Sequence, residues 1–365
     1  SDSNNLTLAR NGSNIGGGAI DATLSTEGLA VTLVYVDATK GWQDIHDSTS
    51  SVTGASFIAA TGGNATLTVG NFKTHVFTAD GNLCVSAVGN PSGSDTVEYL
   101  VVAGGGPNGD AGAGNAYASG GGGAGGFRFA SSTLGSPNPL NASNIPVSVA
   151  TIPVTVGGGG SFPGNGSNSV FSTITSAGGG GGGRDNCTSP TQQGSDGGSG
   201  GGGSGCNNAS GGAGNTPPVS PSQGFPGGQG KEPSNTSGGG GGSAAGEEAS
   251  VSPEPAQKGG DGGDGSFIPD AFVGPTAPSY GTPGPVGSSR FFAGGGAGGG
   301  GKGAGTGCGG AGGAGGGGAG GGPLPNPSGV AGTTNTGGGG GGSRGTTTTE
   351  LNGGSGIVMI RYKFQ

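Results

Sequence analysis

Short apolar runs along this chain repeatedly end in stretches of glycine. Residues 98–103 read EYLVVA and lead directly into Gly104, and residues 153–156 and 171–177 precede glycine stretches in the same way. Continuous or alternating apolar runs of about four to eight residues are typical of β-strands. Strands that continue into glycine indicate that these glycine stretches are ordered parts of the fold.

Strand patterns also occur on both sides of the glycine-rich part. The first β-rich stretches are separated by Asn-Gly and Glu-Gly turn signals, which predict a small antiparallel β module over residues 1–53. Further strand patterns follow, and the apolar run at residues 356–364 is predicted to return and pair with them. Residues 54–365 are therefore predicted to form one domain, a β base plus a glycine-rich bundle closed by that last strand. The strand patterns of the base cover residues 65–69, 73–78, 83–86 and 97–103.

Glycine accounts for 101 of the 365 residues and forms unbroken runs such as residues 178–183 and 337–342. This composition alone suggests a disordered linker, because glycine has the most backbone entropy to lose and no side chain to bury. The flanking strands favour another solution, a bundle of polyproline-II-like glycine helices known as polyglycine II. Such a helix has three residues per turn and no internal hydrogen bonds, so its N–H and C=O groups must bond to neighbouring chains. A helix surrounded on all sides needs glycine at nearly every position.

The predicted fold class is therefore all-β with a glycine-rich polyglycine-II helix bundle. No segment carries a long 3.6-residue apolar period, so almost no α-helix is expected. Ordering each residue costs about 1–2 kcal/mol, whereas each net hydrogen bond returns about 0.5–1.5 kcal/mol, so the strands and a small core must support the bundle. The glycines predicted to be structural are Gly104, Gly121, Gly158, Gly180, Gly202, Gly240, Gly299, Gly317 and Gly340.

The four cysteines are Cys84, Cys187, Cys206 and Cys308. A disulfide between Cys187 and Cys206 would clamp one loop between two glycine runs. The alternative is four small buried thiols. Their spacing fits no zinc motif.

Composition and charge narrow the class of protein. Hydrophobic residues make up 28% and charged residues 9% of the chain, which excludes a large ordinary core. The formal net charge is -8 and the 12 Lys and Arg are spread thinly, so nucleic-acid binding and membrane insertion are not expected. No apolar stretch reaches the roughly 20 residues that cross a bilayer. The start at Ser1 is typical of a trimmed or processed chain, and the composition favours a secreted or surface-displayed structural protein.

The irregular connectors between glycine runs are the best candidate binding sites, because binding residues commonly lie on loops held by a rigid scaffold. Residues 267–292 are the richest connector, and their rings could form an apolar or stacking surface for a sugar or an outer-membrane protein loop. The alternative is that these rings cover the flank of the bundle as a small core. The aromatic candidates are Phe267, Phe272, Tyr280, Phe291 and Phe292.

A second candidate is the polar connector around Cys187, which would make a hydrogen-bonding tip loop. The alternative is ordinary solvated loop polarity. Its candidate residues are Arg184, Asp185, Asn186, Gln192 and Gln193.

Catalytic motifs in this chain are accidents of composition. Many windows match G-x-G-x-x-G, but none combines a following helix with an acidic residue at dinucleotide spacing. The two histidines, His46 and His75, lie in separate β segments, and no motif places a nucleophile beside either of them. The chain is therefore expected to be neither an enzyme nor a cofactor-binding protein.

Acidic loop residues leave two weaker alternatives open. Glu247 and Glu248, together with Asp261 and Asp264, could supply the paired carboxylates of a glycan depolymerase. Asp261 and Asp264 also resemble calcium-binding glycine-aspartate repeats. Two aspartates in a single copy do not build the six- to eight-oxygen cage that calcium takes.

Several segments resemble glycine-rich tail-fibre-like proteins of marine bacteriophages of the cyanophage type. The resemblance covers most of the chain, and residues 6–45 look like the β module that precedes such domains. The architecture is also similar to the distal tail-fibre adhesins of T-even-like phages, in which glycine-helix bundles hold variable loops that touch a host receptor. This chain differs in its greater length and its very long insertions. The segments that carry the resemblance are residues 96–106, 120–127, 154–157 and 353–363.

The resemblance implies a non-catalytic virion fibre or adhesin that presents receptor-binding loops on a rigid bundle at the virion surface. Its expected partners are other fibre, tail or capsid proteins and a bacterial surface receptor, either an outer-membrane protein or a glycan. The resemblance leaves the number of subunits open, since phage fibres are generally homotrimers whereas the tip adhesin of T-even-like phages acts as a single chain. The alternatives are a capsid- or tail-surface decoration protein without a specific receptor, an ice-binding protein, and a glycan depolymerase.

Overall fold

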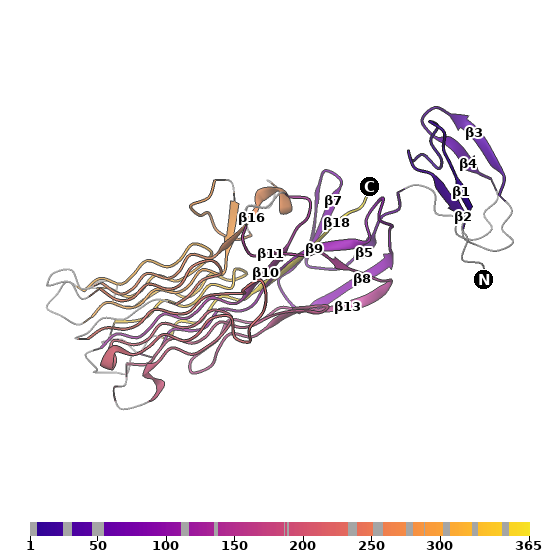
Figure 1. Ribbon diagram of the computed structural model, residues 1–365. Helices are drawn as coiled ribbons and strands as arrows, with labels where there is room; N and C mark the ends of the chain where they lie inside the picture. The colour runs from indigo at the N-terminus through magenta and orange to yellow at the C-terminus, as the bar shows by residue number, and fades with distance from the viewer. Residues whose placement is uncertain are drawn as a thin grey trace.

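The computed structural model is an elongated molecule with β-sheets between an N-terminal β module and a glycine-rich bundle (Figure 1). The predicted fold class is confirmed, because strands and extended glycine segments make up nearly all of the described chain and its helical elements are three short 3₁₀ turns. The structure describes residues 6–24, 31–45, 55–110, 117–134, 138–185, 187, 190–232, 239–250, 258–274, 280–287, 289–301, 307–322, 328–344 and 350–365.

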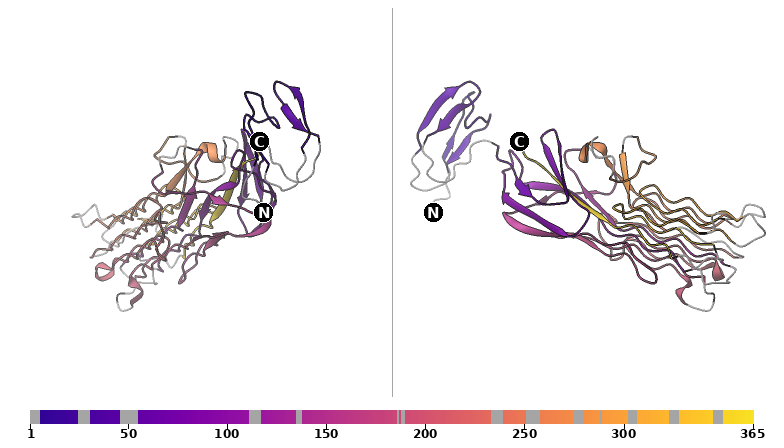
Figure 2. Two further views of the ribbon diagram at one scale, coloured as in Figure 1. Left: turned by 45° about the vertical axis from the view of Figure 1, so that its right-hand side comes forward. Right: turned by 180° about the vertical axis from the view of Figure 1, so that it is seen from behind.

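The N-terminal module consists of two small hairpins. β1 (Leu6–Leu8) pairs with β2 (Ala22–Leu24), and β3 (Leu33–Asp37) pairs with β4 (Gly41–Asp44), both antiparallel. Both views in Figure 2 place this module beyond the sheets, on the side away from the glycine bundle.

The larger sheet forms the centre of the molecule. Its strand order is β11-β10-β9-β18-β7-β6, with β12 pairing β9 off this path. β18 lies between β7 and β9 and is antiparallel to both, so a strand near the C-terminus occupies the middle of the sheet. The strands are β6 (Ala65–Val69), β7 (Phe72–Phe77), β9 (Thr96–Val102), β10 (Phe127–Ala130), β11 (Asn141–Ala142), β12 (Ile145–Pro146) and β18 (Ile357–Lys363).

A second sheet, of order β15-β14-β13-β8-β5, covers one face of the larger sheet, and the hairpin β16–β17 covers the other. The second sheet contains β5 (Ala59–Thr61), β8 (Gly81–Ala87), β13 (Ala150–Thr155), β14 (Ser169–Phe171) and β15 (Ile174–Ser176). The covering hairpin consists of β16 (Ser266–Pro269) and β17 (Ser289–Phe292). The turn η3 (Asp270–Phe272) follows directly after β16.

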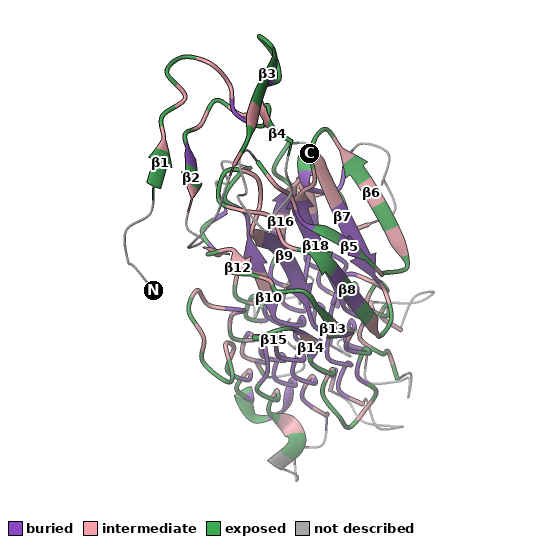
Figure 3. Ribbon diagram, turned by 90° about the vertical axis from the view of Figure 1, so that its right-hand side faces the viewer, coloured by how far each residue is buried: buried purple, intermediate pink, exposed green. Residues whose placement is uncertain are grey.

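Because both faces of the larger sheet are covered, β9 and β18 have continuous apolar runs. Alternate side chains of a strand point to opposite faces of its sheet. Leu100 and Met359 pack on the face that Phe272 covers, whereas Tyr99 and Ile360 pack on the face that the second sheet covers. All four side chains are buried, and the purple centre of Figure 3 marks this small core.

The strands continue directly into the glycine bundle, whose extended segments we call rods. β9 runs into residues 103–109, β15 into residues 177–184, and β17 into residues 293–301, while β18 is entered from residues 351–356. The rods leave the sheets in one direction (Figures 1 and 2). The sheets therefore fix the positions at which the rods begin.

Hydrogen bonds between rods recur every three residues. Gly120, Gly123 and Gly126 donate their backbone N–H groups to residues 183, 180 and 177, over N–O distances of 2.8–3.0 Å. The carbonyls of the same three glycines accept from residues 109, 106 and 103 of another rod. This period is that of a polyglycine-II helix, which has three residues per turn and bonds only to its neighbours.

Residues 118–126 form the central rod of the bundle. Its N–H groups donate to three neighbouring rods. One is the rod at residues 177–183 described above, and the other two contain Gly340, which accepts from Gly122, and Gly240, which accepts from Ala124. Its carbonyls accept from three further rods. One is the rod at residues 103–109 described above, and the other two contain Gly296, which donates to Gly122, and Gly202, which donates to Gly121. Six rods of the same chain therefore surround it and bond to most of its backbone groups.

The lack of a side chain makes this packing possible. A Cβ built on Gly180 would overlap the Ser195 carbonyl oxygen, and a Cβ on Gly340 would overlap that of Leu351. The other predicted structural glycines at which an added Cβ would meet a neighbouring carbonyl oxygen are Gly104, Gly121, Gly240, Gly299 and Gly317. Gly202 takes part through its bond to Gly121.

Gly158 takes part through its carbonyl, which accepts from the N–H of Ser167 at 3.0 Å, but this position does not require the absence of a side chain. This residue is exposed, and a Cβ built on it would meet nothing within 4 Å. It lies in the short rod that follows β13, where one side of the backbone faces solvent. A side chain can therefore be accommodated there without separating two rods.

Rods at the bundle surface use side-chain oxygens in place of a missing neighbour. Asn165 and Asn168 accept from the N–H groups of Gly181 and Gly178 through their Oδ1 atoms, at 3.0 and 2.9 Å. The three-residue spacing of these asparagines matches the helix period, so both amides face the same rod. An amide side chain at every third position thus satisfies a rod that would otherwise have unpaired N–H groups.

Candidate functional site

Several connectors of the bundle lie at the end farthest from the sheets, which we call the distal end. The turns η1 (Pro190–Gln192) and η2 (Cys206–Asn208) both lie there (Figure 1). Loops held by a rigid scaffold are the usual place for binding residues. The distal end is therefore the surface on which a receptor site is most reasonably sought.

Arg184 is held at the point where its rod enters the distal connector. Its Nη2 atom lies 3.0 Å from Asp110 Oδ2, and its guanidinium carbon lies 5.7 Å from the centre of the Phe162 ring. Its backbone N–H donates to the Thr191 carbonyl at 2.9 Å. The ion pair is partly exposed and contributes little stability on its own, but the three contacts together fix the side chain's direction.

A disulfide joins two distal connectors. Cys187 and Cys206 are bonded, with their Cα atoms 5.2 Å apart, and Cys206 is buried. Asn207 strengthens the junction, because its Nδ2 atom donates to the Cys187 carbonyl and its N–H to Glu232 Oε1, both at 3.2 Å. Three connectors are thus tied into one patch. The alternative of four buried thiols is wrong, since Cys84 and Cys308 are exposed.

A groove of about 340 Å³ opens on the flank beside this patch. Phe162 and Pro163 line one part of it and exposed Gln193 another. The remaining lining residues are Pro107, Gly181, Gly182, Thr191, Gly194 and Ser195. A half-buried aromatic ring, rod backbone and exposed polar side chains form the kind of mixed surface that small ligand sites use.

The other predicted residues of the polar connector have different positions. Asp185 is buried with 1% of its surface exposed, so its predicted role in receptor contact is wrong. Gln192 is half-buried, and its carbonyl accepts from the N–H of Ser204 at 3.0 Å, so its backbone supports the connector. Asn186 lies outside the described residues.

The aromatic connector at residues 267–292 lies beside the larger sheet and not at the distal end (Figure 1). Phe272 and Phe292 are completely buried, and Phe291 is 2% exposed, so the predicted receptor contact is wrong for these three rings. Thr74 of β7 fixes the connector by donating its hydroxyl to the Phe272 carbonyl at 3.0 Å. Phe272 and Phe292 fill the core because β9 and β18 need an apolar cover on this face.

Phe267 and Tyr280 are only partly covered. The Phe267 ring lies 5.6 Å from the Phe291 ring, and Tyr280 packs at the edge of the core. Only the Tyr280 contact belongs to the small core, because Phe267 and Phe291 form a pair on the other face of the hairpin β16–β17. Both rings lie apart from the distal patch.

Asp261 and Asp264, the two weak calcium candidates, both bond to protein groups in the structure. Their Oδ1 atoms accept from the N–H groups of Ala311 and Ala314, at 2.6 and 2.8 Å, and Lys258 also bonds Asp261. The two carboxylates thus cap a neighbouring rod in the same way as the asparagine pair above. Among the residues that the structure describes, no group of three or more His, Cys, Asp or Glu side chains is placed to hold a metal ion.

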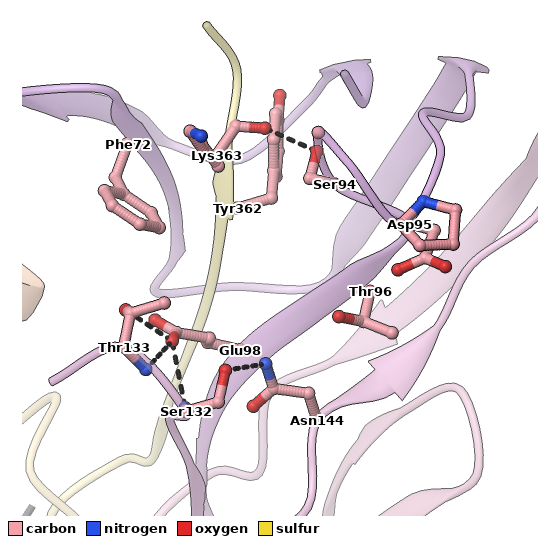
Figure 4. A pocket seen from close by; sticks show the side chains of 12 residues that line it. Phe72, Ser94, Asp95, Thr96, Glu98, Ser132, Thr133, Asn144, Tyr362 and Lys363 are labelled. Atoms are coloured by element: carbon pink, nitrogen blue, oxygen red, sulfur yellow. Dashed lines mark hydrogen bonds between the residues drawn. The ribbon is translucent and has the colours of Figure 1, made fainter. Parts of the chain in front are cut away.

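A second, smaller pocket of about 180 Å³ lies at the sheet end and borders a buried ion pair (Figure 4). Glu98 Oε2 bonds Arg361 Nη1, and Glu98 Oε1 accepts from the Thr133 N–H and hydroxyl at 3.0 and 2.7 Å. Arg361 also lies 3.7 Å over the Phe72 ring. Burial lowers the pKa of Arg361, and the Glu98 carboxylate opposes that shift.

Sequence reasoning missed this ion pair, although a signal was present. Glu98 is the charged residue of β9, and Arg361 follows the apolar run at residues 357–360 of β18; the two strands pair directly with Glu98 opposite Arg361. Opposite charges in two apolar runs predict a buried pair, because an unpaired buried charge is very costly. Glu98 Oε1 accepts from residues 131–133 and fixes that loop, while Oε2 bonds Arg361, which favours a structural role for the ion pair.

Comparisons with known proteins place most of the chain in one family. The sequence profile described as Glycine-rich domain matches residues 78–363. No curated protein matches the chain. None of the helical segments in the described ranges has both the length and the apolar character that a bilayer span requires. The match begins at the end of β7 and extends to the end of β18, so it contains every rod described above. The chain therefore belongs to the glycine-rich domain family.

Proposed function

We propose that this chain is a non-catalytic bacteriophage fibre protein, an adhesin that presents host-recognition loops at the distal end of its bundle. The observation that carries the proposal is the fixed distal patch, in which a disulfide and the contacts of Arg184 hold irregular connectors on a rigid support. A surface built for binding must keep its loops in one geometry, because ordering them on binding lowers affinity.

The construction of the bundle supports the same function. The central rod is satisfied by six rods of its own chain, so the bundle carries its connectors without help from another protein. The sequence resemblance to tail-fibre-like proteins adds the virion as the setting. The disulfide fits a protein exposed on the virion surface, because such bonds persist in oxidising surroundings.

We further propose that the receptor is a component of the bacterial outer surface and that it contacts the groove lined by Phe162 and Gln193. The groove contains Thr191 of the distal turn η1, and its ring and polar rim suit either a sugar or a protein loop. The N-terminal module, at the other end of the molecule, would then face the virion.

Binding of the purified full-length chain to living bacteria tests this function. The labelled chain is added to a panel of cyanobacterial strains, and saturable binding to at least one strain is expected. Gln193→Lys should abolish that binding by filling the groove. The matched control is Thr68→Lys, which places the same side chain at an exposed position of β6 near the other end of the molecule.

Two results would count against the proposal. Absence of saturable binding by the folded chain to any strain would favour a surface decoration protein. Equal loss of binding in Gln193→Lys and Thr68→Lys would mean that the groove is not the receptor site.

A further inference from the structure

The pocket at the sheet end has a structural floor, but its walls carry polar groups that the fold does not use. Both carboxylate oxygens of Glu98 already bond, one to Arg361 and the other to residues 131–133. Four other lining residues keep hydrogen-bonding capacity that no described residue takes up. These residues are Asp95, Thr96, Ser132 and Asn144.

Asp95 and Asn144 supply hydrogen-bond acceptors. Within the part of the chain that the structure describes, the Asp95 carboxylate forms no hydrogen bond or ion pair. The Asn144 Nδ2 atom donates to Ser132 Oγ at 2.9 Å, whereas its Oδ1 atom is buried and accepts from no described group. A buried acceptor without a donor is unfavourable, so this oxygen favours a molecule that donates to it.

Thr96 and Ser132 supply hydroxyl groups, which can both donate and accept. Ser132 Oγ accepts from Asn144, so its own proton remains to be donated. The Thr96 hydroxyl makes no hydrogen bond to a described residue. The pocket therefore combines acceptors with potential donors, and a ligand hydroxyl, itself a donor and an acceptor, can satisfy both.

The sheet holds these groups in place. Thr96 is the first residue of β9 and lies opposite Pro146 of β12 in the strand register. The carbonyl of Asp95 accepts from the N–H of Val147 at 3.4 Å. Figure 4 shows the Phe72 ring on the opposite side of the pocket from Asp95. Walls that are already ordered lower the entropy cost of binding a small molecule.

Charge and size indicate what kind of molecule fits. The ion pair in the floor is neutral as a unit, and the negative Asp95 is matched by the positive Lys363, whose Nζ atom lies 5.2 Å from the centre of the Phe57 ring. The volume of about 180 Å³ is below the roughly 300 Å³ at which clefts for drug-sized ligands begin. The pocket therefore suits one small uncharged ring, whose apolar face can pack on the ring of Phe72.

We propose that this pocket binds one uncharged sugar unit, whose hydroxyls donate to Asp95 and to Asn144 Oδ1 and whose C–H face lies against Phe72. A free monosaccharide and the terminal unit of a longer glycan present this same chemistry. The pocket lies beside the sheets, whereas the groove proposed for the receptor lies on the flank of the bundle. The inference does not rest on the proposed receptor binding.

Saturation-transfer NMR on the purified full-length chain tests the site. The probes are glucose, galactose, mannose and xylose, and at least one should bind saturably with a dissociation constant of about 1 mM, because a ligand this small gains little binding free energy. Thr96→Val keeps the shape of the side chain and removes its hydroxyl, and Asp95→Leu removes the carboxylate. Each change should weaken binding about tenfold, which is the effect of one lost hydrogen bond.

Two controls accompany these variants. Thr68→Val makes the same replacement as Thr96→Val at an exposed position of β6 outside the pocket, and it should leave sugar binding unchanged. Gln193→Lys fills the distal groove and should also leave it unchanged, so failure of the receptor proposal and failure of this one are distinguishable. The thermal melts of the two pocket variants should match that of the unmodified chain, because neither replaced side chain bonds to a described residue.

Beads that carry the bound sugar as a terminal unit distinguish the two sources of the ligand. Capture of the chain by the beads, lost in Thr96→Val, shows that the end of a glycan enters the pocket, whereas binding of free sugar without capture shows a site for a monosaccharide. Absence of saturable binding of all four sugars to the folded chain would overturn the proposal. Equal weakening by Thr68→Val, or loss of binding in Gln193→Lys alone, would do the same. Binding of methylguanidinium that no sugar displaces would show a cation site in its place.

Discussion

Gly123 donates its backbone N–H to the carbonyl oxygen of Gly180 over 2.8 Å, and the two glycines belong to separate rods. A Cβ on Gly180 would overlap the Ser195 carbonyl of a third rod. The absence of a side chain is therefore what allows three rods to meet. Glycine in this fold is an interior residue, although in most proteins it marks a turn or a flexible linker.

Replacement of a buried rod glycine is expected to destabilise the bundle strongly. Gly180→Val and Gly340→Val should each cost at least about 3 kcal/mol of unfolding free energy, since both overpacking and lost hydrogen bonds contribute. Urea unfolding followed by circular dichroism measures the change. Gly158→Val is the control, because its side chain would enter open space and should change stability by less than about 0.5 kcal/mol. Unchanged stability of Gly180→Val and Gly340→Val would contradict the close packing of the rods.

Replacing only one partner of the Glu98–Arg361 pair is expected to lower the unfolding free energy strongly. Both side chains are 3% exposed, so Glu98→Gln leaves a buried charge without its partner and should cost about 3–5 kcal/mol. Arg361→Met in the same chain should restore part of that loss, because the charge is then removed. Urea unfolding of both single variants and the double variant forms a complete cycle. Additive effects would show that the two residues do not act as a pair.

Stability should fall when the solution becomes mildly acidic. Burial lowers the pKa of His75, the hydrogen bond to the Gly62 carbonyl opposes the shift, and the charge of Lys73 adds to the lowering. As pH falls below about 6.5, the unfolded chain binds a proton that folded His75 resists, so the unfolded state is favoured. The loss should level off once pH is below the lowered pKa of the folded state.

His75→Gln should remove this part of the pH dependence. The measurement compares thermal unfolding of both proteins between about pH 7.5 and 5. His46 is present in both and therefore cancels in the comparison. Parallel curves for the two proteins would contradict the assignment to His75.

Removal of the disulfide should loosen the distal end more than the bundle. The bond closes a loop with a sequence separation of 19, for which chain entropy predicts a stabilisation of about 3 kcal/mol. In the variant with Cys187→Ser and Cys206→Ser, limited proteolysis should cut near the distal connectors while the rods stay protected. Cleavage spread evenly along the rods would contradict this local role.

Asp264 is expected to act as a cap and not as a calcium ligand. Asp264→Ala leaves the Ala314 N–H without its acceptor and should lower unfolding free energy by about 1 kcal/mol. Thermal melts with and without added calcium should coincide in the unmodified chain. A rise in melting temperature with calcium that disappears in the variant would restore the metal interpretation.

The rods could be predicted from sequence, but their arrangement could not. Uninterrupted glycine requires neighbours on all sides, which follows from the helix period alone. The pairing of Gly123 with Gly180 does not follow, because one glycine differs from another only by its position. The exposed position of Gly158 could not be predicted for the same reason, since nothing in a glycine run distinguishes an interior rod from one at the surface.

The aromatic residues illustrate a second limit. Phe272 and Phe292 lie in a proline-rich connector, and composition alone suits either a binding surface or a small core. The decision depends on whether the two central strands are left uncovered, which only the assembled sheet reveals. The strand at residues 356–364 could be predicted more directly, because its continuous apolar run requires cover on both faces. β18 accordingly lies in the middle of the sheet.

Hydrogen exchange of the central rod tests the account most directly. Amides at residues 118–126 are surrounded by six rods, so their exchange should be as slow as that of β9 and β18. The amide of Gly158, in an exposed rod at the bundle surface, provides the comparison within the same sample. Slow exchange across the central rod is the predicted result. Exchange at the rate of an unstructured glycine linker would contradict the bundle and every proposal built on it.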